Sequence, residues 1–126
     1  MYRIDYDEGR NLLKLTLSGF WQPETFAAFV QDMRKTTERI TRQRGGYDLL
    51  SDSTQFPVQS AEVSQGFAKM FQAGVHANSG RMAIVVKSML NKMQAEHVFA
   101  GTGIRIFLDA ADALAWLDRA RAEVGQ

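Results

Sequence analysis

The length and composition of this 126-residue chain, with 45% hydrophobic and 23% charged residues, are those of one soluble domain with a single core. A formal net charge of +1 gives no overall field to attract nucleic acid, so we expect no nucleic-acid partner. The absence of cysteine excludes disulfides, thiolate catalysis and zinc sites built on sulfur. No stretch is apolar over the roughly 20 residues of a membrane span, and the first residues lack the apolar run of a signal peptide. We therefore expect a cytoplasmic domain with no transmembrane segment.

The first residues predict a β-hairpin. Tyr2, Ile4 and Tyr6 alternate with charged residues, which is typical of an edge strand with one face in water. A turn-rich segment follows at 7–11, and leucines alternate again over 13–17. The chain is thus expected to begin with two antiparallel strands.

Three helical segments follow, each with apolar residues at helical spacing. The first is predicted to begin at Pro23, where a missing N–H costs nothing, and to end at Gly45 and Gly46. The second begins after Ser60 and the third after Ser88, and both serines are candidate helix caps. For the third helix, the inward face is expected to consist of Met89, Leu90, Met93, His97 and Ala100.

The strands between these helices differ in polarity. Residues 47–50 are a short strand candidate, and the polar residues 51–55 are interpreted as a turn. Residues 82–86 are apolar on both faces, as in an inner parallel strand that is covered on both sides.

The last strand and helix form the clearest unit of the chain. From Ile104 to Leu108, aliphatic residues alternate with Arg105 and Phe107, which predicts a short buried strand, and Asp109 then caps an amphipathic helix. The predicted order is ββαβαβαβα. Because strands alternate with helices, we predict an α/β domain with a mostly parallel sheet and an antiparallel N-terminal edge strand. The pattern does not fix the order of the strands.

This order, together with the closing sequence Gly-Ile-Arg-Ile-Phe-Leu-Asp-Ala-Ala-Asp-Ala-Leu-Ala-Trp-Leu at 103–117, resembles the SpoIIAA-like fold. STAS domains, which are anti-sigma-factor antagonists, and small stand-alone bacterial proteins share that fold. The resemblance covers the chain as one domain, residues 1–126, and implies a bacterial protein-interaction or regulatory module. STAS antagonists are switched by phosphorylation of a serine in an Asp-Ser-Ser-Gly motif. Ser60 matches that serine, but Val58, Gln59 and Ala61 replace its neighbours, so a plain helix cap is the favoured interpretation of Ser60.

Sequence motifs of enzymes are missing. The chain has no nucleophile elbow, no His-Glu-x-x-His and no phosphate-binding Gly-x-x-x-x-Gly-Lys. Our leading hypothesis is therefore a non-enzymatic STAS-like interaction module that needs no cofactor and no metal. Its partner-binding residues are predicted to be Ser53, Thr54, Ser60 and Glu62.

Two further hypotheses stay open. The SpoIIAA-like fold is similar in topology to CRAL-TRIO lipid-transfer domains, which implies a carrier or sensor of a small apolar ligand or lipid. The third and weakest hypothesis is a small hydrolase that uses Ser53 and Asp52. The residues predicted to line the apolar ligand pocket are Phe67, Met70, Phe71, Met89, Met93 and His97. A place in the core is the simpler interpretation of these residues.

Five of the 15 basic residues fall within positions 34–44. A solvated helix face explains them most simply. The alternative is a patch of Lys35, Arg39 and Arg42 that docks on an acidic partner or on anionic lipid headgroups, where each cation contributes only about 1 kcal/mol. A homo-oligomer is also left open by the sequence.

Overall fold

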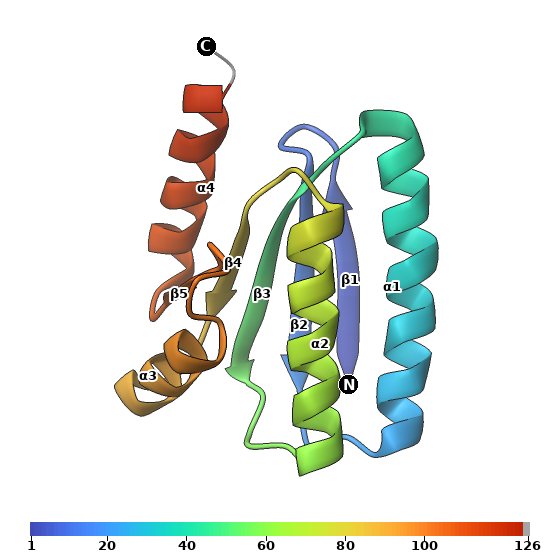
Figure 1. Cartoon of the computed structure of the whole chain (residues 1–126), viewed down its shortest axis with the longest axis vertical. Helices are drawn as coiled ribbons and strands as arrows, with labels where there is room; N and C mark the ends of the chain where they lie inside the picture. Colours follow the sequence, from blue (N-terminus) through green and yellow to red (C-terminus); the bar gives the residue numbers. More distant parts are fainter. Residues whose placement is uncertain (125–126) are drawn as a thin grey trace.

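The computed structural model describes residues 1–124 and contains one five-stranded sheet with helices packed around it (Figure 1). The predicted order ββαβαβαβα is confirmed. In chain order the elements are β1 (Tyr2–Asp7), β2 (Leu12–Ser18), α1 (Pro23–Arg44), β3 (Asp48–Gln55), α2 (Ala61–Ala77), β4 (Met82–Val85), α3 (Met89–Val98), β5 (Arg105–Phe107) and α4 (Ala110–Val124).

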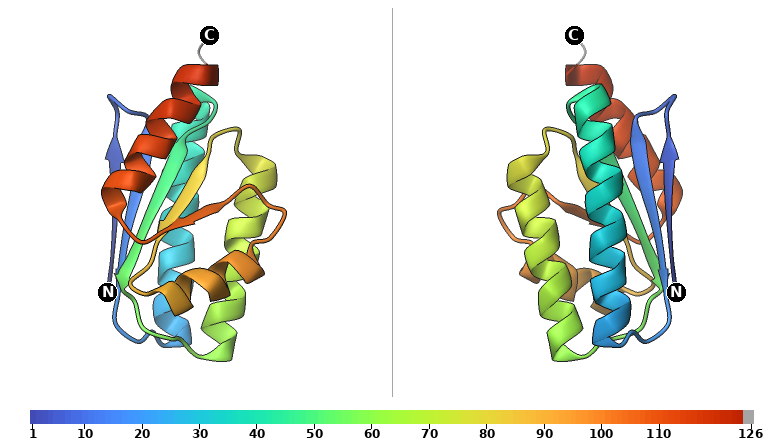
Figure 2. Two further views of the ribbon diagram at one scale, coloured as in Figure 1. Left: turned by 90° about the vertical axis from the view of Figure 1, so that its left-hand side faces the viewer. Right: turned by 90° about the vertical axis from the view of Figure 1, so that its right-hand side faces the viewer.

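The strand order, which the sequence left open, is β1-β2-β3-β4-β5. The edge strand β1 is antiparallel to β2, and every later pair is parallel. Each parallel strand therefore lies beside the one that precedes it in the chain. The side views in Figure 2 show α1 and α2 together on one side of the sheet. This is the α/β architecture that the sequence predicts.

Alternation along the strands produces two hydrophobic clusters, one on each face of the sheet. The larger cluster lies under α1 and α2 and includes the fully buried Leu13, Leu15 and Phe29. The smaller cluster lies under α4, where Leu50 and Val85 contact helix residues. All of β4 is buried, because both of its faces are covered, as predicted.

An aromatic cluster packs at the N-terminal ends of α1 and α2, where the loops enter these helices. The ring of Trp21 lies 5.2 Å from Phe56, and 5.3 Å from both Phe29 and Phe67. Its Nε1–H donates to the carbonyl oxygen of Ser18 over 2.8 Å, so the buried indole has a polar partner. This cluster fixes the segment that leads into α2.

The strand β3 is longer than the predicted 47–50, because residues 51–55 continue it instead of forming a turn. Ser51 is fully buried, and its Oγ lies 3.3 Å from the Oγ of Ser53. Asp52 accepts hydrogen bonds from the backbone N–H and the hydroxyl of Thr54, over 3.1 and 2.7 Å. The polar side chains thus satisfy one another within a strand. At the other end of the sheet, the predicted strand residue Leu108 follows β5 and is 44% exposed.

The prediction for the inward face of α3 is wrong. Ser88 caps the helix as expected, accepting from the N–H of Asn91 over 3.1 Å. However, Met89, Leu90 and Met93 are 57%, 64% and 60% exposed. The residues of its partly buried side, at helical spacing, are Asn91, Lys92 and Ala95, followed by Phe99.

The rotation of α3 has a physical cause in the residue that ends it. Phe99 packs against the larger cluster, with its ring 6.0 Å from the ring of Phe71. Ala95, one turn earlier, packs there as well. With Ala95 and Phe99 packed on this cluster, the methionines of α3 face outward.

Candidate functional site: a cleft between α2 and α3

A cleft of about 480 Å³ lies between α2, α3 and the loop 56–59. The ends of three strands meet there, represented by Leu17 of β2, Ser53 of β3 and Val86, which follows β4. Open α/β sheets bind ligands at the carboxyl ends of their strands. The cleft is therefore in the position where this kind of sheet most often carries a site.

A chain of aromatic rings lines the inner wall of the cleft. Phe56 and Phe67 lie 5.3 Å apart, Phe67 and Phe71 6.1 Å, and Phe71 and Phe99 6.0 Å. Phe67 and Phe71 project from α2, Phe56 precedes that helix, and Phe99 follows α3. The wall thus offers a continuous aromatic surface.

The polar lining of the cleft consists of hydroxyl and amide groups. Gln59 is held in place, because its Nε2 donates to the carbonyl oxygens of Gly19 and Pro57 over 3.0 and 2.7 Å. The other polar lining residues are Ser53, Ser64, Asn91 and Gln94. None of the described residues that line the cleft has an ionisable side chain.

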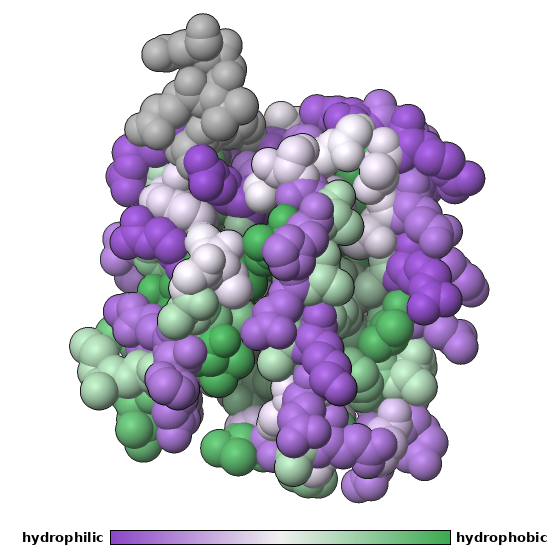
Figure 3. All heavy atoms as spheres, in the orientation of Figure 1, coloured by the Kyte–Doolittle hydropathy of each residue, from purple (hydrophilic) through white to green (hydrophobic). Residues whose placement is uncertain are grey.

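Two apolar residues that line the cleft are exposed. Val58 in the loop is 81% exposed, and Val98 at the end of α3 is 47% exposed. Met89, Leu90 and Met93 of α3 are exposed as well, but they do not line the cleft. In Figure 3 this apolar surface is visible at the lower left, where Figure 1 draws α3.

In its overall fold, the chain is similar to the solved structure of an uncharacterized protein from the DUF3478 family. That protein has a SpoIIAA-like fold and comes from Shewanella loihica PV-4. The two are 19% identical, the match covers 92% of this chain and 93% of that chain, and the TM-score is 0.67. The fold is SpoIIAA-like. At this level of identity the likeness shows the fold alone. No family model matches the sequence, and no curated protein matches it.

The predicted partner-binding residues of this SpoIIAA-like domain do not all face the cleft. Ser53 lines it. Ser60 caps α2, as expected, and accepts from the N–H of Val63 over 3.3 Å. Thr54 donates its hydroxyl to Asp52, and Glu62 is exposed in the first turn of α2.

The six residues predicted to form an apolar pocket do not share one cavity. Phe67 and Phe71 line the cleft. Met70 projects from another side of α2, into a smaller cavity of about 270 Å³ between α1 and α2. Met89, Met93 and His97 lie on the exposed side of α3, for the reason given above. The prediction of one shared pocket is therefore corrected, because Met70, Met89, Met93 and His97 do not line the cleft.

Sequence reasoning missed several residues of the cleft wall. The sequence analysis does not single out Phe56 or Phe99, although both line the cleft. Phe99 directly follows α3, and an aromatic residue at a helix end is a signal that was available. Asn91 and Gln94 carry no such signal, because polar residues on a helix are usually assigned to solvent.

The predicted basic patch of Lys35, Arg39 and Arg42 lies on exposed positions of α1. Figure 1 shows α1 on the far side of α2 from α3, so this patch is separate from the cleft. Near its end, Arg44 donates to the carbonyl oxygen of Glu8 over 3.1 Å.

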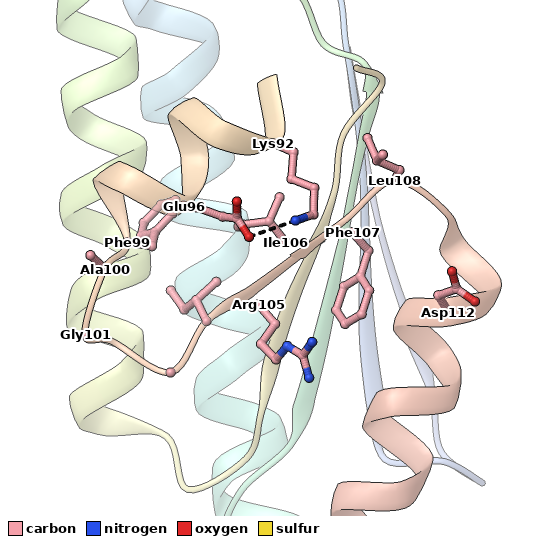
Figure 4. Close-up of a pocket in the computed structure, with 12 residues that line it drawn as sticks. Lys92, Glu96, Phe99, Ala100, Gly101, Arg105, Ile106, Phe107, Leu108 and Asp112 are labelled. Carbon is pink, nitrogen blue, oxygen red and sulfur yellow. Dashed lines mark hydrogen bonds and ion pairs between the residues drawn. The ribbon is translucent and has the colours of Figure 1, made fainter. Parts of the chain in front are cut away.

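A further cavity, of about 400 Å³, lies along β5 between α3 and α4 and has charged lining residues (Figure 4). Lys92 and Glu96 form an ion pair of 2.8 Å across one side of it. The guanidinium of Arg105 lies 5.3 Å from the ring of Phe107, in cation–π range. Asp112 of α4 completes its charged lining. The cavity along β5 therefore has a charged lining, whereas the cleft between α2 and α3 has none.

The titratable groups with perturbed acidity lie outside the cleft. Burial raises the pKa of Tyr47, and a hydrogen bond to Asp32, followed by burial, raises the pKa of Tyr2. Among the side chains that the structure describes, residues 1–119, no group of three or more His, Asp or Glu is arranged to hold a metal ion. None of the helices within residues 1–124 combines the length and the apolar composition needed to span a bilayer.

Proposed function

We propose that this protein is a non-enzymatic STAS-like interaction module of the bacterial cytoplasm that binds a protein partner. The binding surface consists of the outer side of α3 and the tip of the loop 56–60. We call it the α3 surface and define it as Val58, Met89, Leu90 and Met93. The SpoIIAA-like fold is compatible with such a role, and the distribution of exposed apolar residues supports it.

The concentration of apolar groups on α3 is the observation that carries the proposal. Of the eight large hydrophobic residues that are exposed in the described part of the chain, four belong to this ten-residue helix, and three of these four, Met89, Leu90 and Met93, belong to the α3 surface. Single exposed apolar residues are normal, whereas a contiguous patch marks a place where another molecule binds. Fully burying one such side chain contributes about 1.5–3 kcal/mol.

The arrangement of the residues proposed for hydrolysis supports the non-enzymatic part. Asp52 and Ser53 are consecutive residues of β3, so their side chains point to opposite faces of the sheet. Both histidines are exposed, and neither is hydrogen-bonded to Ser53 in the described part of the chain. A nucleophile needs a base within hydrogen-bonding reach.

Affinity capture from the host, with quantitative mass spectrometry, tests the partner surface. The wild-type chain is expected to retain one protein in stoichiometric amount. Met93→Glu and Val58→Glu place a charge on the α3 surface at exposed positions and should abolish that retention. The matched control is Ala28→Glu, which adds the same charge at an exposed position of α1. Unchanged capture by both surface variants contradicts the proposal.

A second candidate function, the carriage of a small apolar ligand, is supported by the aromatic wall of the cleft. The volume of about 480 Å³ lies within the range of about 300–1,000 Å³ that small-molecule sites occupy. Native mass spectrometry of protein purified from the host tests it. Added mass that solvent extraction removes supports a carried ligand, and a clean unliganded mass argues against one.

A further inference from the structure

The lining of the cleft between α2 and α3 contains no charge, although the protein around it is well charged. At the average content of 23% charged residues, its 17 lining residues would include about four. The neighbouring cavity along β5, which is smaller, contains Lys92, Glu96, Arg105 and Asp112. The lack of charge is therefore a property of this cleft and not of the protein's surface in general.

An anionic group that entered the cleft would find no cation among the residues that line it. Taking an ion out of water is costly unless a partner of opposite charge or several hydrogen bonds replace its hydration. The two helices that begin beside the cleft are already capped. The N–H of Val63 donates to the Oγ of Ser60 over 3.3 Å, and the N–H of Asn91 to the Oγ of Ser88 over 3.1 Å. These two amides are thus not available to an anion, and neither of the capping serines lines the cleft.

Neutral hydrogen-bonding groups are available in the cleft. The Oγ of Ser53 shares a hydrogen bond of 3.3 Å with the buried Ser51 and keeps further capacity to donate or accept. The side-chain amides of Asn91 and Gln94 have no hydrogen bond to another described residue, and each can both donate and accept. Ser53 belongs to β3 and the two amides belong to α3, whereas Phe67 and Phe71 of the aromatic wall belong to α2.

We propose that this cleft is a binding site for a small uncharged ligand with an aromatic or alicyclic body and a neutral polar group such as a hydroxyl, ketone or amide. Its body packs on Phe67, Phe71 and Phe99, and its polar group is bound by Ser53, Asn91 or Gln94. The site selects against carboxylates, free fatty acids included, because no cation in its lining pairs with a carboxylate. This inference rests on the second candidate function and gives the class of its ligand.

The test uses two probes of the same shape that differ in charge, 2-naphthalenemethanol and 2-naphthoate, titrated at pH 7.5 against the whole protein. Binding is followed by the amide resonances of Ser53, Asn91 and Gln94 in ¹⁵N-correlation spectra. We expect the alcohol to bind at least tenfold more tightly than the carboxylate and to shift these resonances. Equal affinities, tighter binding of the carboxylate, no binding of the alcohol, or shifts confined to another region would overturn the proposal.

A charge-introducing variant provides the second measurement. Gln94→Lys places an ammonium group in the lining at an exposed position, where the fold tolerates it. It should tighten the binding of 2-naphthoate at least tenfold and remove the preference for the alcohol. Gln72→Lys makes the same change at an exposed position of α2 outside the cleft lining and should leave both affinities unchanged. An unchanged preference in Gln94→Lys contradicts the assigned ligand class.

These titrations are separable from the tests of function. A clean unliganded mass from the host removes the idea of a carried ligand, while the ratio of the two probe affinities still decides the chemistry of the cleft. Capture of a protein partner, in turn, is tested by Met93→Glu at a residue that does not line the cleft, whereas Val58 belongs both to the α3 surface and to the cleft lining.

Discussion

The helices α2 and α3 begin in the same way and lie in different environments. Each starts after a serine whose hydroxyl accepts from the third N–H of the helix. Yet α2 buries Val63, Phe67 and Phe71, whereas α3 buries no residue. A capped helix with apolar residues at the right spacing need not contribute those residues to the core. The side of α3 that faces inward is the one that continues through Ala95 to Phe99, which both pack against the larger cluster.

The largest effect is expected in the aromatic cluster on the α1–α2 side. Trp21→Ala removes a side chain that is only 1% exposed and contacts four other rings. We expect the free energy of unfolding to fall by about 3–5 kcal/mol, measured by urea denaturation. The control is Phe20→Ala, whose side chain is 60% exposed and should matter much less. Similar losses from both would contradict the described core.

A smaller but clear effect is expected where the chain turns from α2 into β4. A Cβ added to Gly80 would lie 1.8 Å from the carbonyl oxygen of Tyr47, so the backbone must shift. Gly80→Ala should therefore lower the free energy of unfolding by about 1–3 kcal/mol. Gly9→Ala is the matched control, because its nearest contact would be an ordinary 3.4 Å to Asp7. If both variants unfold at the same urea concentration, the close approach at Gly80 is refuted.

The two serine caps compare the helices directly. Ser60→Ala should lower the free energy of global unfolding by about 1 kcal/mol, because α2 is part of the cooperative core. Ser88→Ala removes the equivalent bond from α3, which is held by few buried contacts and is expected to open locally. Its main result should be faster hydrogen exchange of the α3 amides, with a smaller change in global stability. Equal effects on global unfolding would mean that α3 is as firmly anchored as α2.

The smallest effect is expected on the outer side of α3. Met93→Gln replaces a 60% exposed side chain by a polar one of similar length. The free energy of unfolding should change by no more than about 0.5 kcal/mol, as for other surface substitutions. Phe71→Leu, on the buried side of α2, should cost more. A loss above about 1 kcal/mol in Met93→Gln would indicate that this residue belongs to the core after all.

Much of the fold and part of the candidate site are predictable from local patterns. The alternation of β1 and β2, Pro23 at the start of α1 and the caps Ser60, Ser88 and Asp109 each depend on residues within a few positions of one another. Of the cleft, sequence reasoning found Ser53, Phe67 and Phe71. Their apolar or strand-end positions gave a local signal, whereas Phe56, Phe99, Asn91 and Gln94 become lining residues only when two distant segments meet.

The order of the elements and the α/β class can be predicted from the sequence, because both follow from short-range periodicity and capping chemistry. The strand order, the extension of β3 through polar residues and the rotation of α3 depend on contacts that form only in the folded chain. The polar run 51–55 continues as a strand because Ser51 and Ser53, and Asp52 and Thr54, satisfy each other's hydrogen bonds. The methionines of α3 face water because Phe99 packs beside Phe71. The strand order, the length of β3 and the orientation of α3 thus depend on contacts between residues far apart in the chain, which no local pattern encodes.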